Sequence, residues 1–143
     1  MCNQLPMTAR VEPVDTLART LWGEARGEGG SGMQAVANVI LNRAGAPRWW
    51  GRDIVSVCRA PWQFSCWNVN DPNLPMMKRV TTADHWFRVA LDIAERAVLG
   101  NLPDLTNRAD HYYATWIAAP HWARGRLPVA THGRHLFFRL ELR

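Results

Sequence analysis

Two glutamates four residues apart, Glu24 and Glu28, are the residues of this sequence best suited to chemistry. They lie in the segment 21–30, where a tryptophan, an arginine and four glycines accompany them. A carboxyl group at the C-terminal end of a helix faces the negative end of the helix dipole, and burial against Trp22 would also favour its protonated form. A carboxylic acid that stays protonated near neutral pH is what cleavage of a glycosidic bond requires. Arg26 would act in the opposite direction, so the sign of the net pKa shift stays open at this point.

The glycines decide whether the two glutamates can act as a pair. On a continuous helix, residues four apart have Cβ atoms about 5–6 Å from each other, which suits the two carboxylates of a retaining glycosidase. Gly27 is expected to end the helix between them. We therefore predict Glu24 as the catalytic acid and Glu28 as a supporting catalytic residue. An ion pair, or a place at the start of the next helix, is the structural alternative for Glu28.

The patterns around this segment predict a mainly α-helical fold, of the α+β type with a small strand component. Apolar residues at helical spacing predict helices over 15–25, 31–44 and 82–99. The segments 109–117 and 136–140 have extended character.

Local signals refine these helices. The second is expected to start with Ser31 as N-cap and Gln34 as its capping-box partner. The third is expected to bury Trp86 in its apolar stripe and to end before Gly100. A short helical turn at 53–57 is expected within a long irregular middle part of the chain, and irregular segments of that length are usually functional.

Length and composition indicate a single folded domain over residues 14–143, preceded by a flexible N-terminal arm over residues 1–13. No apolar run approaches the roughly 18 residues of a membrane span, so stable membrane insertion is not expected. The first residues lack the basic and apolar regions of a signal peptide. Synthesis in the cytoplasm is the resulting expectation.

Charge and aromatic content point to anionic or sugar-containing partners. The net charge is +5, which favours nucleic acid, membrane or an anionic polymer such as a bacterial envelope. Several of the eight tryptophans lie in segments rich in Pro, Gly and Asn: Trp49, Trp50, Trp62, Trp67, Trp116 and Trp122. Aromatic side chains on loops suit stacking on sugar rings or on nucleobases, and composition alone does not choose between these two.

Two other kinds of site receive less support. The spacing of Cys58 and Cys66 fits no zinc site, and the two residues are either buried thiols or a disulfide; Cys2 is expected to be a free thiol. His132 and His135 have ligand-like spacing, with His111 and His121 nearby in the sequence, but no His-Glu-x-x-His helix exists. No recognised nucleic-acid-binding motif is present either. No metal or cofactor is therefore predicted.

The motif Glu24-Ala25-Arg26-Gly27-Glu28, followed by Gln-Ala-Val-Ala-Asn-Val-Ile-Leu-Asn-Arg at 34–43, resembles the opening of the SleB-type cell-wall hydrolase family. The resemblance continues in order over nearly the whole chain, from about residue 15 to residue 138. Its further matches are Ile54 and Val55, the Gln-Phe-Ser segment 63–65, the helix around 90–99, Tyr112 and Tyr113, the region of Trp122, and the segment 132–137.

This resemblance implies a compact, lysozyme-like catalytic domain that cuts peptidoglycan glycan strands between N-acetylmuramic acid and N-acetylglucosamine. Glu24, the first glutamate of the motif, would be the general acid. In lytic transglycosylases of this kind one glutamate serves twice: it protonates the glycosidic oxygen and then helps to remove the proton from the muramic acid 6-hydroxyl, which gives a 1,6-anhydro product. A muramidase-type hydrolase with Glu24 and Glu28 as a pair is the alternative.

The resemblance also suggests which residues bind the substrate and where the protein acts. Sugar hydroxyls and N-acetyl groups would be bound by Gln63, Ser65, Tyr112 and Tyr113, and Trp67 or Trp122 would form a stacking wall; core packing or loop structure is the alternative for each. The residues around 63–65 (Trp62, Cys66 and Trp67) depart from the family pattern. With no secretion signal or separate wall-binding domain in view, we expect a monomeric phage endolysin that reaches the cell wall in the periplasm through a partner pore.

Overall fold

The computed structural model describes residues 7–142, with side chains from residue 10 onward. The long helices are α1 (Met7–Ala25), α2 (Gly29–Ala44) and α5 (His85–Val98). The short elements are α3 (Ile54–Arg59), α4 (Leu74–Arg79) and the 3₁₀ turns η1 (Arg26–Glu28), η2 (Ser65–Trp67) and η3 (His121–Ala123). The strands are β1 (His111–Ala114), β2 (Ala130–His132) and β3 (His135–Phe138). The predicted mainly helical fold with a small strand component is confirmed.

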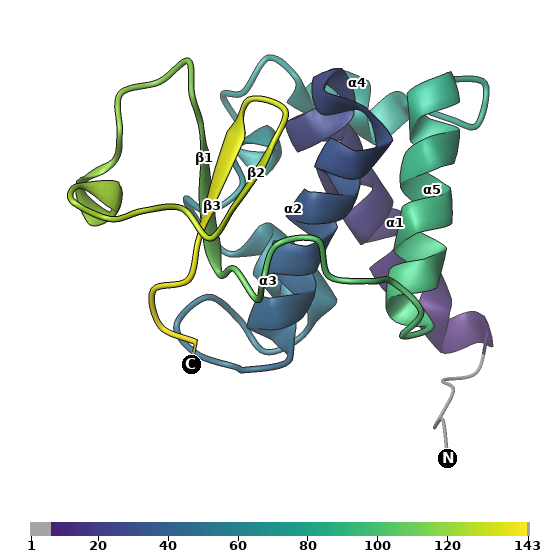
Figure 1. Ribbon diagram of the computed structural model, residues 1–143. Helices are drawn as coiled ribbons and strands as arrows, with labels where there is room; N and C mark the ends of the chain where they lie inside the picture. Colours follow the sequence, from purple (N-terminus) through teal and green to yellow (C-terminus); the bar gives the residue numbers. More distant parts are fainter. Residues whose placement is uncertain (1–6, 143) are drawn as a thin grey trace.

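Helix α2 occupies the centre of the molecule, between the sheet and the other two long helices (Figure 1). Apolar residues on two of its faces explain this position. Met33, Val36 and Ile40 are fully buried in the main core, to which α1 and α5 also contribute. Val39 packs on Phe137 of β3 in a second, smaller cluster. A helix that is apolar on two faces is stable only when both are covered, so α2 fixes the sheet relative to the helices.

The start of α2 differs from the prediction. The helix begins at Gly29, with Glu28 as N-cap, and Ser31 lies inside it, so the predicted N-cap and capping box are wrong. Gly29 has φ 76°, a left-handed conformation that glycine adopts without strain and that carries η1 directly into α2. The Gln34 side chain donates instead to the backbone oxygen of Pro103 at 2.9 Å.

The N-terminal part of α1 is also more regular than expected. Residues 7–13 of the predicted flexible arm belong to the helix, although Pro13 lies within it. Proline removes one helical N–H donor, but the chain on both sides can still be helical. Residues 1–6 of the predicted arm lie outside the described residues.

The predicted turn at 53–57 is helix α3, which Asp53 and Ser56 begin with a reciprocal capping box. Helix α5 starts after Asp84, whose carboxylate accepts the N–H of Phe87 at 2.9 Å. Its buried stripe contains Phe87 rather than Trp86, which is 39 % exposed, so that prediction is wrong. Phe87 is spaced at i, i+3 and i+7 with the buried Ala90 and Ala94, and Trp86 lies one position outside this face. Gly100 follows the helix with φ 77°, as predicted.

The sheet is antiparallel, with the strand order β1-β3-β2. The predicted extended segments 109–117 and 136–140 contain β1 and β3, and β2 adds a short hairpin to β3. β1 is therefore an edge strand, and the long segment that follows it, with η3, projects away from the helices (Figure 1). In the described part of the chain, no helix has both the length and the apolar character needed to cross a membrane.

Candidate active site

A cleft of about 420 Å³ lies along β1 and brings together residues that are far apart in the sequence. Its lining comes from α1 (Glu24), α2 (Arg43), the loop 62–65, β1 with the segment that follows it (111–122), and β3 (His135). Among these described lining residues, Glu24 is the one acidic side chain.

Glu24 lies in the last turn of α1, partly exposed to the cleft. The protein around it desolvates the carboxyl group, and this burial raises its pKa above the ordinary value. The backbone N–H of Cys66 donates to Glu24 Oε1 at 3.3 Å, and the Cys66 thiol and the Tyr112 hydroxyl also bind the carboxyl group. These hydrogen bonds lower the pKa of Glu24 by less than burial raises it, and the negative charge of Asp71 adds to the increase.

Tyr112 is a hydrogen-bond donor to this acid. Burial of its hydroxyl raises its pKa well above the ordinary value, and the charge of Glu24 raises it further. Tyr112 therefore stays protonated and can donate to Glu24 when the carboxyl group is ionised.

Gly23 allows the loop segment that carries Cys66 to approach α1 closely. A Cβ atom at position 23 would lie 2.8 Å from Cys66 Cβ and 3.1 Å from Cys66 Sγ. Glycine is unfavourable inside a helix by about 1 kcal/mol relative to alanine. Here the missing side chain lets η2 pack against the last turn of α1 and place its N–H on Glu24.

Arg26 was expected to lower the pKa of Glu24, but its side chain is engaged by other residues. Its guanidinium lies 4.0 Å from the Trp22 ring centroid and donates to the Trp22 backbone oxygen and to Asn73 Oδ1. The main contributions to the pKa of Glu24 do not include Arg26. The opposing effect expected from this arginine is therefore minor, and the pKa of Glu24 shifts upward.

Glu28 does not line the cleft. It accepts hydrogen bonds from Arg134 Nε at 3.0 Å and from the Arg134 backbone N–H at 3.3 Å, and its side chain is 6 % exposed. A Cβ atom at Gly32 or at Gly133 would collide with the Glu28 side chain, so two glycines make room for it. The ion pair that was the structural alternative for Glu28 is present. Because α1 ends at Ala25, the two glutamates lie on different elements: Glu24 in α1 and Glu28 in η1.

Most of the predicted substrate-binding residues meet in the cleft: Gln63, Ser65, Tyr112, Tyr113 and Trp122. Trp67 does not. Its indole N–H donates to Thr20 Oγ1 on α1 at 2.9 Å, and its ring lies under the guanidinium of Arg59. This polar anchor turns Trp67 away from the cleft wall, so its predicted position there is wrong.

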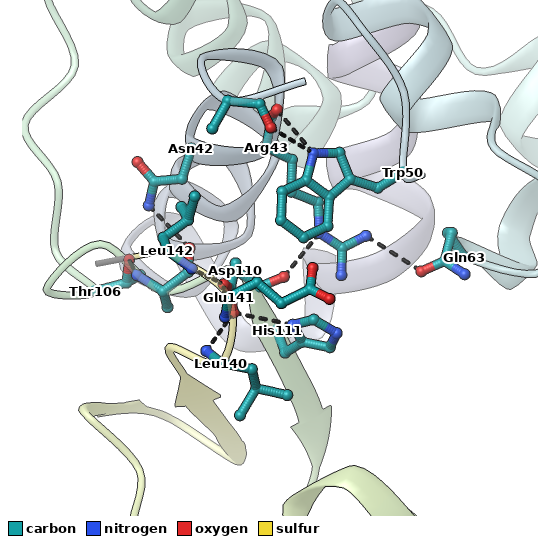
Figure 2. A network of polar contacts seen from close by, with 12 residues as sticks. Asn42, Arg43, Trp50, Gln63, Thr106, Asp110, His111, Leu140, Glu141 and Leu142 are labelled. Carbon is teal, nitrogen blue, oxygen red and sulfur yellow. Dashed lines mark hydrogen bonds and ion pairs between the residues drawn. The ribbon is translucent and has the colours of Figure 1, made fainter. Parts of the chain in front are cut away.

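A polar network stabilises one end of the cleft (Figure 2). Asp110 is fully buried, and it accepts His111 Nδ1–H at 2.9 Å and the backbone N–H groups of residues 140–142. Burial raises the pKa of Asp110, but these hydrogen bonds together hold it well below the ordinary value. Arg43 donates to the Asp110 backbone oxygen at 2.7 Å and to Gln63 Oε1 at 3.2 Å. The network thus orients both His111 and Gln63.

Several lining residues were absent from the predicted site. Arg43 ends the second stretch of the family-like motif, and His111 directly precedes Tyr112, so proximity to the motifs was the signal that could have found them. Trp62 and Trp116 are 86 % and 58 % exposed at the cleft, which agrees with the expectation that loop tryptophans are available for stacking. Trp50 is instead fully buried, with its indole N–H donating to backbone oxygens.

The histidines and cysteines form no metal centre in residues 7–142, where no group of three or more potential ligands is gathered. His132 Nε2 lies 2.7 Å from the Leu105 backbone oxygen, and His135 lines the cleft. Cys58 and Cys66 are buried free thiols. Cys2 lies outside the described residues.

Residues 27–138 match the family model described as Cell Wall Hydrolase, a segment that includes Glu28 and starts three residues after Glu24. The chain is 31 % identical over 123 residues to the spore cortex-lytic enzyme of Bacillus subtilis, covering 85 % of this chain and 35 % of that protein. It is 32 % identical over 126 residues to the spore cortex-lytic enzyme of Halalkalibacterium halodurans, covering 87 % of this chain and 34 % of that protein. The chain thus spans about a third of the length of these curated relatives.

Two solved structures share the fold. The catalytic domain of the germination-specific lytic transglycosylase SleB from Bacillus anthracis superposes with a TM-score of 0.69 at 24 % identity, covering 96 % of this chain and 98 % of that one. The catalytic domain of the Bacillus cereus SleB protein gives a TM-score of 0.70 at 24 % identity, covering 94 % and 95 %. These likenesses establish the fold.

Proposed function

Because the chain belongs to the cell wall hydrolase family, we propose that it is a peptidoglycan glycosidase that cuts glycan strands between N-acetylmuramic acid and N-acetylglucosamine. The observation that carries this proposal is the buried carboxyl group of Glu24, which has a raised pKa and faces the cleft. A protonated carboxylic acid at that position can donate its proton to the glycosidic oxygen as the bond breaks.

The surroundings of Glu24 support its use in both halves of the reaction. Once its proton has left, the carboxylate is stabilised by the Cys66 N–H and the Tyr112 hydroxyl. It can then accept the proton of the attacking group. Attack by the 6-hydroxyl of muramic acid gives a 1,6-anhydro product, and attack by water gives a reducing end.

We favour attack by the 6-hydroxyl, as in a lytic transglycosylase. Among the described residues that line the cleft, Glu24 is the one carboxylate, and Glu28 is occupied by Arg134 outside the cleft. The muramidase alternative needs a second carboxylate within reach of the sugar, about 5–5.5 Å from the first in a retaining enzyme. The positions of Gln63, Ser65, Tyr113 and Trp122 on the cleft wall support their proposed contacts with sugar hydroxyls and rings.

Digestion of purified peptidoglycan, followed by mass spectrometry of the products, tests the proposal. We expect muropeptides that are lighter than the reducing-end products by the mass of one water, which identifies the 1,6-anhydro ring. Reducing ends alone would overturn transglycosylation while keeping the glycosidase. Cleavage only of peptide or amide bonds would overturn the glycosidase itself.

A finer proposal concerns the setting: we propose a phage endolysin, for which the net charge of +5 supports attraction to an anionic wall. Production in a bacterial cytoplasm, with and without a co-expressed pore-forming protein, tests it. Lysis only in the presence of the pore is the expected result. Lysis without any pore protein would overturn this setting.

A further inference from the structure

His135 combines burial, a place in the cleft lining and an unsatisfied ring nitrogen. The residue is 2 % exposed, and its Nδ1 atom is buried with no hydrogen-bond partner among the described residues. The same side chain lines the cleft that contains Glu24. Buried polar atoms without a partner are uncommon in folded proteins, so this one needs an explanation.

The unsatisfied nitrogen indicates which tautomer the ring adopts. A buried N–H without an acceptor is rarer than a buried acceptor without a donor, so the proton is expected on Nε2 and the lone pair on Nδ1. Burial lowers the pKa of His135, the Glu28 carboxylate opposes that shift, and Arg134 adds to it. Because Nδ1 is the buried nitrogen and the residue lines the cleft, Nε2–H of the neutral ring is the donor available to a ligand there.

The neighbours of His135 place this donor close to the acid and within an apolar wall. The ring centroid of His135 lies 5.1 Å from that of Tyr112, which hydrogen-bonds Glu24. The ring centroid of Trp116 lies 5.8 Å from that of His135, and Ala114 is the partner of His135 in the β1–β3 register. Ala114, Trp116 and Ile117 all line the cleft. One N–H donor beside apolar groups matches an acetamido group, which has a carbonyl oxygen and a methyl group.

We propose that His135 is a specificity-determining residue that donates its Nε2–H to the acetamido carbonyl oxygen of a sugar bound beside Glu24, while the acetamido methyl contacts the neighbouring apolar wall. This rests on the proposed function, since it names the feature of the glycan that the same cleft recognises. His135 acts here as a fixed neutral donor and transfers no proton.

The tautomer is tested on the unmodified protein, without any measurement of activity. Long-range ¹H–¹⁵N correlation spectra of ¹⁵N-labelled protein distinguish the two neutral forms of each histidine. We expect His135 to carry its proton on Nε2 at neutral pH, and His111, which faces Asp110, to carry a proton on Nδ1. A proton on Nδ1 of His135, or on both of its nitrogens, would overturn the proposal.

Ligand specificity is tested with two neutral trisaccharides, triacetylchitotriose and cellotriose, which share β-1,4-linked rings and differ in the acetamido groups. We expect His135→Phe to weaken the binding of triacetylchitotriose about tenfold, which is the effect of losing one hydrogen bond, and to leave the binding of cellotriose unchanged. His135→Gln, which keeps an N–H donor, should recover part of the loss. His132→Phe, on the same hairpin but outside the cleft lining, is the matched control and should change neither affinity.

Equal weakening of both sugars by His135→Phe, or no weakening of either, would overturn the proposal. If that variant does not fold, the tautomer of the unmodified protein still decides. If the protein binds triacetylchitotriose through His135 but leaves peptidoglycan intact, only the proposed function is wrong. If the protein cleaves peptidoglycan but His135 carries its proton on Nδ1, only this inference is wrong.

Discussion

Glu24 and Glu28 belong to one short motif, yet the fold gives them opposite surroundings. Glu24 faces the cleft, no cation among residues 10–142 forms an ion pair with it, and its hydrogen-bond donors are uncharged groups of η2 and β1. Glu28 packs between two glycines and is paired with Arg134 of the β2–β3 hairpin. Burial without a counter-charge favours the protonated acid at Glu24, whereas the Glu28 carboxylate accepts hydrogen bonds from the side chain and backbone N–H of Arg134. We therefore propose that the same residue type serves acid chemistry at Glu24, whereas at Glu28 it packs and pairs with Arg134.

The strongest test of this contrast is Glu24→Gln, which removes the transferable proton and keeps the shape of the side chain. Loss of general acid catalysis is worth about 10²–10⁴ in rate, so we expect at least a hundredfold slower release of muropeptides. Circular dichroism should show an unchanged fold. Retention of most activity by Glu24→Gln, together with its loss in Glu28→Gln, would reverse the assignment of the acid.

Gly23→Ala tests whether the contact with Cys66 places the acid. The added Cβ would meet Cys66 Cβ at 2.8 Å, so η2 must shift away from Glu24. Overpacking typically costs about 1–3 kcal/mol, against a gain of about 1 kcal/mol in helix propensity. We expect a lower free energy of unfolding in urea and slower cleavage.

Gly30→Ala is the matched control for Gly23→Ala. A Cβ at Gly30 would lie 3.8 Å from the nearest side-chain atom, Val89 Cγ1, which is an ordinary contact. This substitution should stabilise the protein by about 0.4–1 kcal/mol and leave cleavage unchanged. If both alanine variants behave alike, the Gly23–Cys66 contact does not position the acid.

The dependence of stability on pH gives a third test, with a sign set by the raised pKa of Glu24. The folded protein keeps the Glu24 proton over a pH range in which the unfolded chain has lost it. The resulting stabilisation is present at acidic pH and is lost as pH rises through the folded-state pKa. Glu24→Gln removes this loss. Its free energy of unfolding, relative to the unmodified protein, should therefore increase from about pH 4 to about pH 8. If the difference in free energy of unfolding between the two proteins stays constant over this pH range, the pKa of Glu24 is not raised by burial.

The parts of the fold that sequence predicted are those that depend on nearby residues. The apolar stripes of α2 and α5, the Asp53 turn and Gly100 follow from local spacing and backbone preference. The errors in the fold lie at the starts of the helices and at Trp86, one position away from the buried stripe of α5. Helix α1 continues past Pro13, and Ser31 lies inside α2 because the turn at Gly29 starts the helix earlier.

The site depends more on contacts between distant residues. Glu24 and Tyr112, which line the cleft, belong to motifs that the sequence shows directly. Arg43 gains its role from Asp110, 67 residues away, and Trp67 was misplaced because Thr20, 47 residues away, anchors its indole. Sequence spacing carries no information on such pairs. The upward pKa shift of Glu24 likewise needed the positions of Arg26 and Cys66 in three dimensions.

The smallest expected effect concerns the link from Glu28 to the cleft. Arg134 pairs with Glu28 and also lies 4.5 Å from the ring centroid of Trp116, an exposed tryptophan of the cleft wall. Glu28 can therefore act as a positioning residue, through Arg134 and Trp116, without touching the substrate. Glu28→Gln should raise KM for soluble glycan strands a few-fold while kcat stays near its original value, since uniform binding rather than acid chemistry is lost.

A double-mutant cycle with Glu28→Gln and Arg134→Gln measures the pair itself. The Arg134 side chain is 63 % exposed, so solvent screens the pair and we expect a coupling of about 0.5–1 kcal/mol in the free energy of unfolding. The two single variants and the double variant should show the same KM, because each breaks the same link to Trp116. A fall in kcat for Glu28→Gln comparable to that for Glu24→Gln would instead place both glutamates in the chemistry, and the contrast between their two surroundings would no longer explain their roles.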